Sequence, residues 1–215
     1  MSTQPLPQEQ PRAEARKAQV LEAATECFRR NGFHGASMAQ ISKTAGMSVG
    51  HIYHYFENKE AIIAAIVERD LMNLLTITER IRKNGAGGDV LRAMVDDVDH
   101  CADDVTNDKN APLMLEIVAE AARNPHVAAI IHKADQAAMD HMRKLFRDGL
   151  QFRGQECTDS ELDGPISLMA ALFEGLTIRL IRNPDLDIKA YLPALRSVTE
   201  YILETLIAKP KTKPE

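Results

Sequence analysis

A serine nucleophile is the first kind of chemistry that the sequence could support. Residues 46–50, GMSVG, match the G-x-S-x-G pattern, in which a sharp turn between a strand and a helix exposes the serine of a hydrolase. That turn requires a strand before the serine and a large α/β sheet, but the residues before Ser48, AQISKTA, have a helical pattern. We therefore interpret Ser48 as a helix cap, and we expect no catalytic residue and no enzyme activity.

Side chains that bind metals or phosphates also occur, but their spacing does not favour a site. The segment 84–89, NGAGGD, lacks the preceding strand and the following lysine of a phosphate loop, so we interpret it as a turn with an aspartate cap. His126, His132 and His141 do not have the i, i+4 spacing of two ligands on one helix face. An acidic cluster spreads around a helix and is typical of a solvated face; it contains Asp96, Asp97, Asp99, His100, Cys101, Asp103 and Asp104. We expect no metal and no cofactor.

The charge of the chain is unevenly distributed. There are 26 Lys and Arg against 31 Asp and Glu, a net charge of −5. Residues 1–60 contain seven basic and six acidic residues, so their net charge is slightly positive. A surface that binds nucleic acid would therefore have to be local and N-terminal.

Three features are typical of a soluble cytoplasmic protein. The longest apolar runs are far shorter than the roughly 20 residues that cross a bilayer. The first residues, MSTQPLPQEQPRAEARK, are polar and contain no cleavage site for secretion. Cys27, Cys101 and Cys157 are far apart and form no CxxC pair, which predicts neither a disulfide framework nor a zinc site. We expect no membrane partner.

Apolar residues recur at helical spacing along nearly the whole chain, and alternating β-branched runs are missing. We therefore expect an all-α protein. Caps and Gly or Pro breaks place nine helices, at 13–31, 37–44, 48–55, 59–82, 89–106, 112–123, 126–152, 160–182 and 187–208. The expected domains are a tail at 1–12, a first domain at 13–58, a helical domain at 59–208 and a tail at 209–215. No flexible linker separates the two domains, so the boundary is soft and falls in the helix that begins at Lys59.

Residues 35–62 have the pattern of a helix-turn-helix: two short capped helices joined by a Gly-containing turn, followed by a long helix. Ala45 is small where the two helices approach each other, Gly46 gives the turn its backbone freedom, and Ile41 and Ile52 are apolar where a core is needed. This stretch resembles the TetR family of transcriptional regulators. The matching residues are Gly35, Ser37, Ile41, Ala45, Gly46, Ser48, Gly50, Ile52, Tyr53, Phe56, Lys59 and Glu60.

Three residues depart from the family pattern. Ser42 stands where the family usually has Ala, and Met47 where Val is usual; we interpret both as packing variations. His51 replaces a common Thr at a position expected to face DNA, so the operator sequence of better-known relatives cannot be transferred.

The resemblance implies a reader of operator DNA. It predicts phosphate contacts from Ser37, Ser48, Tyr53, Tyr55 or His54, and Lys59, with an N-terminal arm of Arg12, Arg16 and Lys17. Gln40, Val49, Gly50 and His51 are expected nearest the base edges. Either Tyr53 or Tyr55 could instead belong to the core, and Tyr53 is the better candidate for DNA.

The resemblance also implies that residues 59–208 bind an effector and form a homodimer. One apolar stripe contains Ile166, Met169, Phe173, Leu176 and Leu180, and a second contains Leu195, Val198, Ile202 and Leu206; together they could form a four-helix interface, or they could only close the core of one chain.

Methionines and acids in this region could line an effector pocket. The candidates are Met72, Met94, Asp97, Cys101, Met114, Glu116, Glu120, Met142, Phe146 and Phe173. The apolar ones could equally be ordinary core, and the acids could be exposed solubility charges. If the acids are buried, a lipophilic cation is a suitable guest, because a buried carboxylate needs a positive partner.

The resulting hypothesis is a homodimeric repressor that a small lipophilic effector releases from its operator, as in the control of an efflux or detoxification gene. The alternative is a helical enzyme or carrier with an incidental helix-turn-helix.

Overall fold

The computed structural model describes residues 9–85, 89–106 and 111–207. The parts of the predicted tails at 1–8 and 209–215 lie outside these residues. The chain forms two compact units, one of residues 1–70 and 112–133 and the other of residues 71–111 and 134–215. The division falls within two long helices. The association of residues 112–133 with the first unit was not expected from the sequence.

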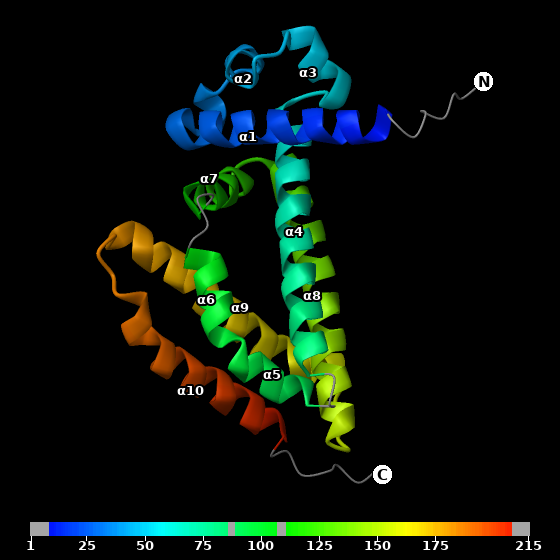
Figure 1. Cartoon of the computed structure of the whole chain (residues 1–215), viewed down its shortest axis with the longest axis vertical. Helices are drawn as coiled ribbons and strands as arrows, with labels where there is room; N and C mark the ends of the chain where they lie inside the picture. Colours follow the sequence, from blue (N-terminus) through cyan, green and yellow to red (C-terminus); the bar gives the residue numbers. More distant parts are fainter. Residues whose placement is uncertain (1–8, 86–88, 107–110, 208–215) are drawn as a thin grey trace, which may run out of the picture. The chain divides into compact units, whose positions relative to one another are not determined.

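The described residues form ten helices and no strand, which confirms the all-α prediction. They are α1 (Glu9–Gly35), α2 (Met38–Ala45), α3 (Val49–Tyr55), α4 (Lys59–Asn84), α5 (Val90–Asp96), α6 (Val98–Thr106), α7 (Ala111–Ala121), α8 (Pro125–Phe152), α9 (Asp159–Arg182) and α10 (Ile188–Ile207) (Figure 1).

Two helix boundaries differ from the prediction. Helix α1 begins at Glu9 and is broken at Gly32, whose φ of 67° and ψ of 171° are not helical, so the expected stop lies inside the assigned helix. The predicted helix 89–106 is divided into α5 and α6 at Asp97, whose backbone N–H bonds to the carbonyls of Ala93 and Val95. Tertiary contacts of the Asp97 side chain, described below, fix this break.

The first unit is built around α1, with α2 packed against α1 and α3 packed against α2 (Figure 1). Its most deeply buried side chains come from all four N-terminal helices and from α7 and α8: Val20, Phe28, Ile41, Ile52, Ile62, Leu113, Ile117 and Val127. These shared buried side chains hold the helix-turn-helix in place against α1.

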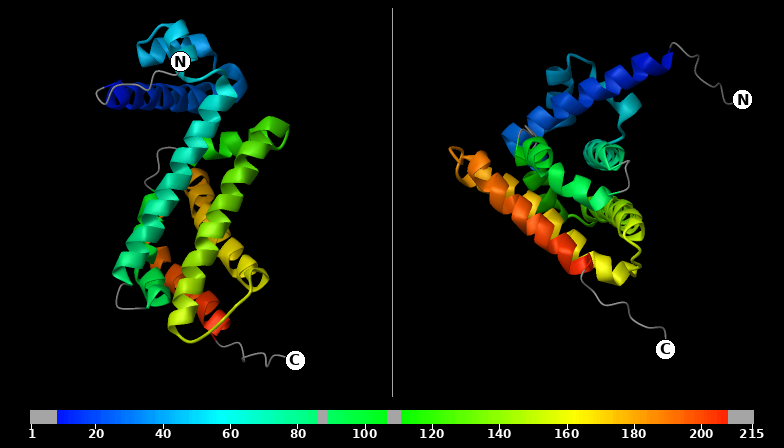
Figure 2. Two further views of the ribbon diagram at one scale, coloured as in Figure 1. Left: turned by 90° about the vertical axis from the view of Figure 1, so that its right-hand side faces the viewer. Right: turned by 60° about the horizontal axis from the view of Figure 1, so that its bottom comes forward.

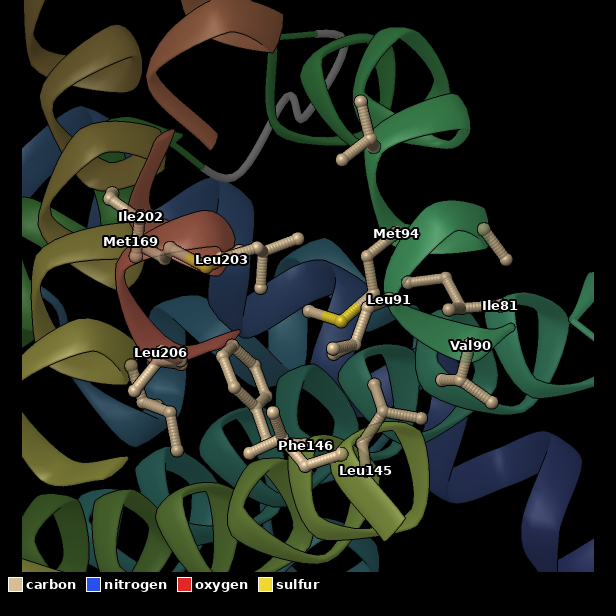
Figure 3. Packing of buried hydrophobic residues seen from close by; sticks show 14 of the residues in the cluster. Ile81, Val90, Leu91, Met94, Leu145, Phe146, Met169, Ile202, Leu203 and Leu206 are labelled. Atoms are coloured by element: carbon tan, nitrogen blue, oxygen red, sulfur yellow. The ribbon is translucent and has the colours of Figure 1, made fainter. Parts of the chain in front are cut away.

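The second unit has its own apolar core. Helix α6 lies beside α9 and α10, and α9 and α10 run side by side (Figure 2). Leu91 and Met94 of α5, Leu145 and Phe146 of α8, and Ile202 of α10 meet in the main cluster (Figure 3). A smaller cluster joins Val98 and Ala102 of α6 to Leu176 of α9 and Leu195 of α10.

Candidate nucleic-acid interface

Helix α2 and the turn after it are held by local hydrogen bonds. The Ser37 hydroxyl accepts from the Gln40 N–H (3.2 Å) and the Ser37 N–H donates to the Gln40 side chain (2.9 Å), which forms a capping box. Gly46 ends the helix with φ of 63°, a left-handed conformation that favours glycine. The Ser42 hydroxyl donates to the Met47 carbonyl at 2.6 Å, so Ser42 bridges the turn and is more than a packing variation.

Helix α3 exposes nearly all of its side chains. The Ser48 hydroxyl accepts from the His51 N–H (3.2 Å), which confirms Ser48 as a helix cap. Ile52 is the buried residue of the helix, while Tyr53 is 50% exposed and Val49 also faces outward. This surface has the exposure that a helix entering a major groove requires.

The Tyr55 ring contacts the rings of two other α3 residues. His51 stacks on Tyr55 with ring centroids 5.4 Å apart, and the ring of His54 meets the Tyr55 ring edge-on at 5.2 Å. Tyr55 is half-buried and Tyr53 is exposed, which supports Tyr53 as the candidate for DNA. A Cβ added to Gly50 would meet nothing within 4 Å, so packing within the chain does not require glycine there.

The Lys59 side chain has structural partners that the sequence did not reveal. Its ammonium donates to the carbonyls of Phe33 (2.6 Å) and Ala36 (3.0 Å) and lies 4.3 Å from the centroid of the Phe33 ring. Lys59 therefore joins the start of α4 to the end of α1 and to the residue that follows it. These contacts give Lys59 a structural role, and its predicted phosphate contact stays a prediction.

The predicted basic arm is the first part of α1. Arg12 and Arg16 are exposed, Arg16 bonds to Gln19 (2.9 Å) and Lys17 pairs with Glu14 (3.1 Å). The Gln19 amide donates to the Ala45 carbonyl (2.7 Å), which ties this helix to the end of α2. Contacts of Arg12, Arg16 and Lys17 with phosphate stay a prediction.

Known families match both parts of the chain. Residues 20–66 match the family described as bacterial regulatory proteins, tetR family. Residues 88–207 match the C-terminal domain of the BetI-type transcriptional repressors. The chain belongs to the TetR family. It is a DNA-binding transcriptional regulator and not an enzyme.

Individual relatives agree with this assignment. The TetR-family chain is 34% identical over 142 residues to the HTH-type transcriptional regulator UidR of Escherichia coli K12, an alignment that covers 66% of this chain and 70% of UidR. The structure of Salmonella enterica GusR is similar with a TM-score of 0.66 and 27% identity, over 88% of this chain and 96% of GusR. FadR of Bacillus subtilis, solved in complex with stearoyl-CoA, shares the fold, with a TM-score of 0.64 and 21% identity over 89% of this chain and 97% of FadR.

The two buried acids predicted for an effector site in this TetR regulator already have partners. Asp97 is 3% exposed and accepts from the Arg80 guanidinium at 2.7 Å, and Arg80 also bonds to Asp104 at 3.0 Å. Glu120 is 1% exposed and bonds to Arg123 and Asn124. The hypothesis of a cationic effector assumed that these carboxylates lack a positive partner. Arg80 and Arg123 are those partners, so neither carboxylate requires a cationic effector.

The remaining effector candidates do not converge on one cavity. Met94 and Phe146 are core, with Met142 and Cys101 packed beside them, and Phe173 packs on the smaller cluster. Met114 and Glu116 belong to α7 in the first unit. Met72 is 55% exposed and lines a groove of about 430 Å³ together with Leu75, Thr76, Glu79, Arg80, Lys83 and Asn84.

Most of the side chains predicted for the dimer interface are buried within one chain. These are Ile166, Met169, Leu176, Leu195, Ile202 and Leu206. Phe173 and Leu180 are half-buried, and Val198 is exposed. The stripes thus close the core of the second unit, which is the alternative that the sequence left open.

Proposed function

We propose that this TetR-family regulator is a homodimeric repressor that acts in the cytoplasm and leaves its operator when a small apolar effector binds. The observation that carries the DNA-reading part is α3, a capped helix with one buried side chain and an exposed face of Val49, Gly50, His51 and Tyr53. In this proposal Ser37, Ser48, Tyr53 and the arm contact phosphates, and Gln40, Val49, Gly50 and His51 lie nearest the bases.

The outer faces of α9 and α10 support a dimer. Leu168, Ile178 and Ile181 of α9 are exposed, and so are Tyr191, Val198 and Tyr201 of α10, with Tyr201 67% exposed. Among the described residues, α9 is the one helix that is long and apolar enough to cross a membrane, and 17% of its apolar stretch is buried. Exposed apolar side chains on two neighbouring helices are typical of an interaction site. We assign it to a second copy of the chain.

The same face of α9 contains small residues. Gly164, Ala171 and Gly175 are spaced at helical intervals with Leu168 and Ile178, and a Cβ added to Gly164 or Gly175 would meet nothing within 4 Å. Packing within one chain therefore does not explain these glycines. Two copies of α9 could approach closely along this face, and a dimer would place two recognition helices about 34–36 Å apart or a multiple of that distance.

The groove on α4 is the proposed entrance for the effector. Its apolar members Met72 and Leu75 lie on the same helix as Arg80, which holds the buried Asp97. The groove of about 430 Å³ is lined by α4 alone and is open to solvent, so in this proposal a second surface closes over the bound effector. FadR of Bacillus subtilis, which shares the fold, was solved with stearoyl-CoA, and this supports a ligand with an apolar chain.

Selection of bound fragments from genomic DNA tests the proposal. The full-length chain should recover a small set of fragments with a two-fold symmetric sequence, since a dimer reads two half-sites. A matched set of neutral, cationic and anionic apolar compounds is then tested for release of the fragment. Recovery of no preferred sequence would contradict the DNA-reading part, whereas bound DNA that no apolar compound releases would contradict only the effector part.

A further inference from the structure

Glu120, near the end of α7, is a buried carboxylate in the same unit as the helix-turn-helix. It accepts from the Arg123 guanidinium (2.9 Å) and the Asn124 amide (3.1 Å), and its Oε2 lies 2.9 Å from His34 Nε2. Burial raises the pKa of Glu120, but hydrogen bonds from Asn124 and Arg123 and the charge of His34 lower it, and the net pKa lies below its ordinary value. The group is therefore ionised near neutral pH.

The three partners of Glu120 differ in position. Arg123 and Asn124 follow it by three and four residues, so they satisfy the carboxylate from its own end of α7. His34 comes from the last turn of α1, and its side chain is 69% exposed. Because the carboxylate keeps two local partners, the His34 bond is not needed to bury Glu120, and it has the effect of joining α7 to α1.

A second carboxylate on α7 lies at the same part of α1. Glu116 precedes Glu120 by one helical turn, and a Cβ added to Gly32 would lie 3.3 Å from its Oε2. Gly32 is the residue at which α1 breaks, with a positive φ that favours glycine. Both acids of α7 thus lie along the break in α1.

The segment after this break leads to the helix-turn-helix. The His34 ring meets the Phe33 ring edge-on, with centroids 5.4 Å apart. The carbonyls of Phe33 and Ala36 bind Lys59 at the start of α4, and the next residue, Ser37, caps α2. A displacement of α7 along α1 would therefore act on residues 32–37, which fix the position of the first helix of the reader.

We propose that Glu120 is a positioning residue for operator binding. Through its bond to His34 it holds residues 32–37, and with them α2 and α3, in the arrangement that binds DNA. Loss of the bond between His34 and Glu120 is the step by which movement of α7 weakens binding. The proposal rests on the DNA-reading function, and neither residue contacts DNA in it.

His34→Ala is the first test, because an exposed side chain can be removed without opening the core. The probe is the operator duplex recovered with the wild-type chain. We expect operator affinity to fall about fivefold or more, the lower range of typical coupling between sites, with little change in the thermal midpoint. His34→Lys, whose ammonium can reach Glu120 and donate to it, should restore affinity close to that of wild type.

A double-mutant cycle isolates the pair. If His34 and Glu120 act through each other, His34→Ala combined with Glu120→Gln should bind no more weakly than the weaker single variant. Arg123→Gln is the matched control, because Arg123 bonds to the same carboxylate from the segment directly after α7. Its operator affinity should stay close to that of wild type.

A salt series separates positioning from direct binding of DNA. If His34 bound a phosphate directly, His34→Ala would flatten the slope of log affinity against log salt by about one unit, whereas removal of a positioning residue leaves the slope unchanged. Wild-type affinity for His34→Ala, additive effects in the cycle, or a flattened slope would each overturn the proposal. Failure of the wild-type chain to bind the duplex would instead contradict the DNA-reading function itself.

Discussion

Arg80 of α4 donates two hydrogen bonds to the Asp97 carboxylate, from Nε at 3.1 Å and from a terminal nitrogen at 2.7 Å. Asp97 is the residue between α5 and α6. The carboxylate is almost fully buried and the guanidinium is about one-third exposed. The pair therefore fixes the break between two helices against the long helix α4, and its two members should respond differently to substitution.

Arg80→Met should destabilise the second unit strongly. It leaves Asp97 as a buried carboxylate without its cation, a change that typically costs about 3–5 kcal/mol. Asp97→Asn should cost less, because Arg80 keeps solvent and Asp104 as partners. Urea unfolding of the two variants measures this difference, and equal losses would contradict the asymmetry.

Glu120 should make stability depend on pH in the acid range. Its pKa is lowered below the ordinary value of 4.5 in the folded chain, so the unfolded chain binds the proton more readily. The stabilisation is therefore complete above about pH 4.5 and is lost as the pH falls through the lower folded pKa. We expect the stability of wild type to fall more steeply than that of Glu120→Gln on acidification below that pH; parallel curves in chemical denaturation would contradict this.

Substitutions of Lys59 and of the N-terminal arm should have different effects on the salt dependence of DNA affinity. Lys59→Met removes two hydrogen bonds to carbonyls, and we expect lower stability, by about 1–3 kcal/mol, with weaker DNA binding of nearly unchanged salt slope. Arg16→Ala should leave stability unchanged and flatten the slope by about one unit, as the removal of a cation that binds phosphate does. The reverse assignment of slopes would show that Lys59 faces DNA after all.

His51 should govern which sequences are bound. It lies on the exposed face of α3, held by stacking on Tyr55, where a side chain reaches base edges. His51→Ala should change the base preference at one position of each half-site, while Tyr53→Phe should weaken all sequences about equally. Fragment selection with each variant measures both effects, and an unchanged preference with His51→Ala would remove it from the base-reading set.

The outer face of α9 and α10 should hold the dimer together. Ile178→Glu and Val198→Glu place charges on exposed apolar positions and should give folded monomers that bind the operator weakly. Phe152→Glu is the control, since it changes an exposed apolar residue at the end of α8, outside this face. Sedimentation with circular dichroism distinguishes the outcomes, and folded dimers in both test variants would place the interface elsewhere.

The sequence predicted local structure better than it predicted tertiary contacts. The caps Ser37 and Ser48 and the turn at Gly46 follow from short-range hydrogen bonding and were confirmed. Phe33, which binds Lys59, and His34, which binds Glu120, lie 26 and 86 residues away from these partners in the chain, and no periodicity reveals such pairs. A sequence does not distinguish an ionisable side chain that binds a ligand from one that is paired with another residue of the same chain.

Apolar stripes were similarly ambiguous. Leu195 and Ile202 share a helix with Val198 and Tyr201, yet the first two are buried in one chain and the last two are exposed. Helix α10 is apolar on more than one face, so its pattern predicts burial without indicating which face another helix of the same chain covers.

The grouping of residues 112–133 with residues 1–70 has a consequence for how the molecule could be recombined. The unit that contains the helix-turn-helix is not one continuous segment of the chain. Helix α7 and the start of α8, more than 40 residues downstream, form part of it. A chimera that joins residues 1–58 to a foreign sensor would inherit His34 without the acid that meets it. Exchange of sensors within the family would thus require the graft to carry a matching helix, and sequence change in α1 would be tied to change in α7.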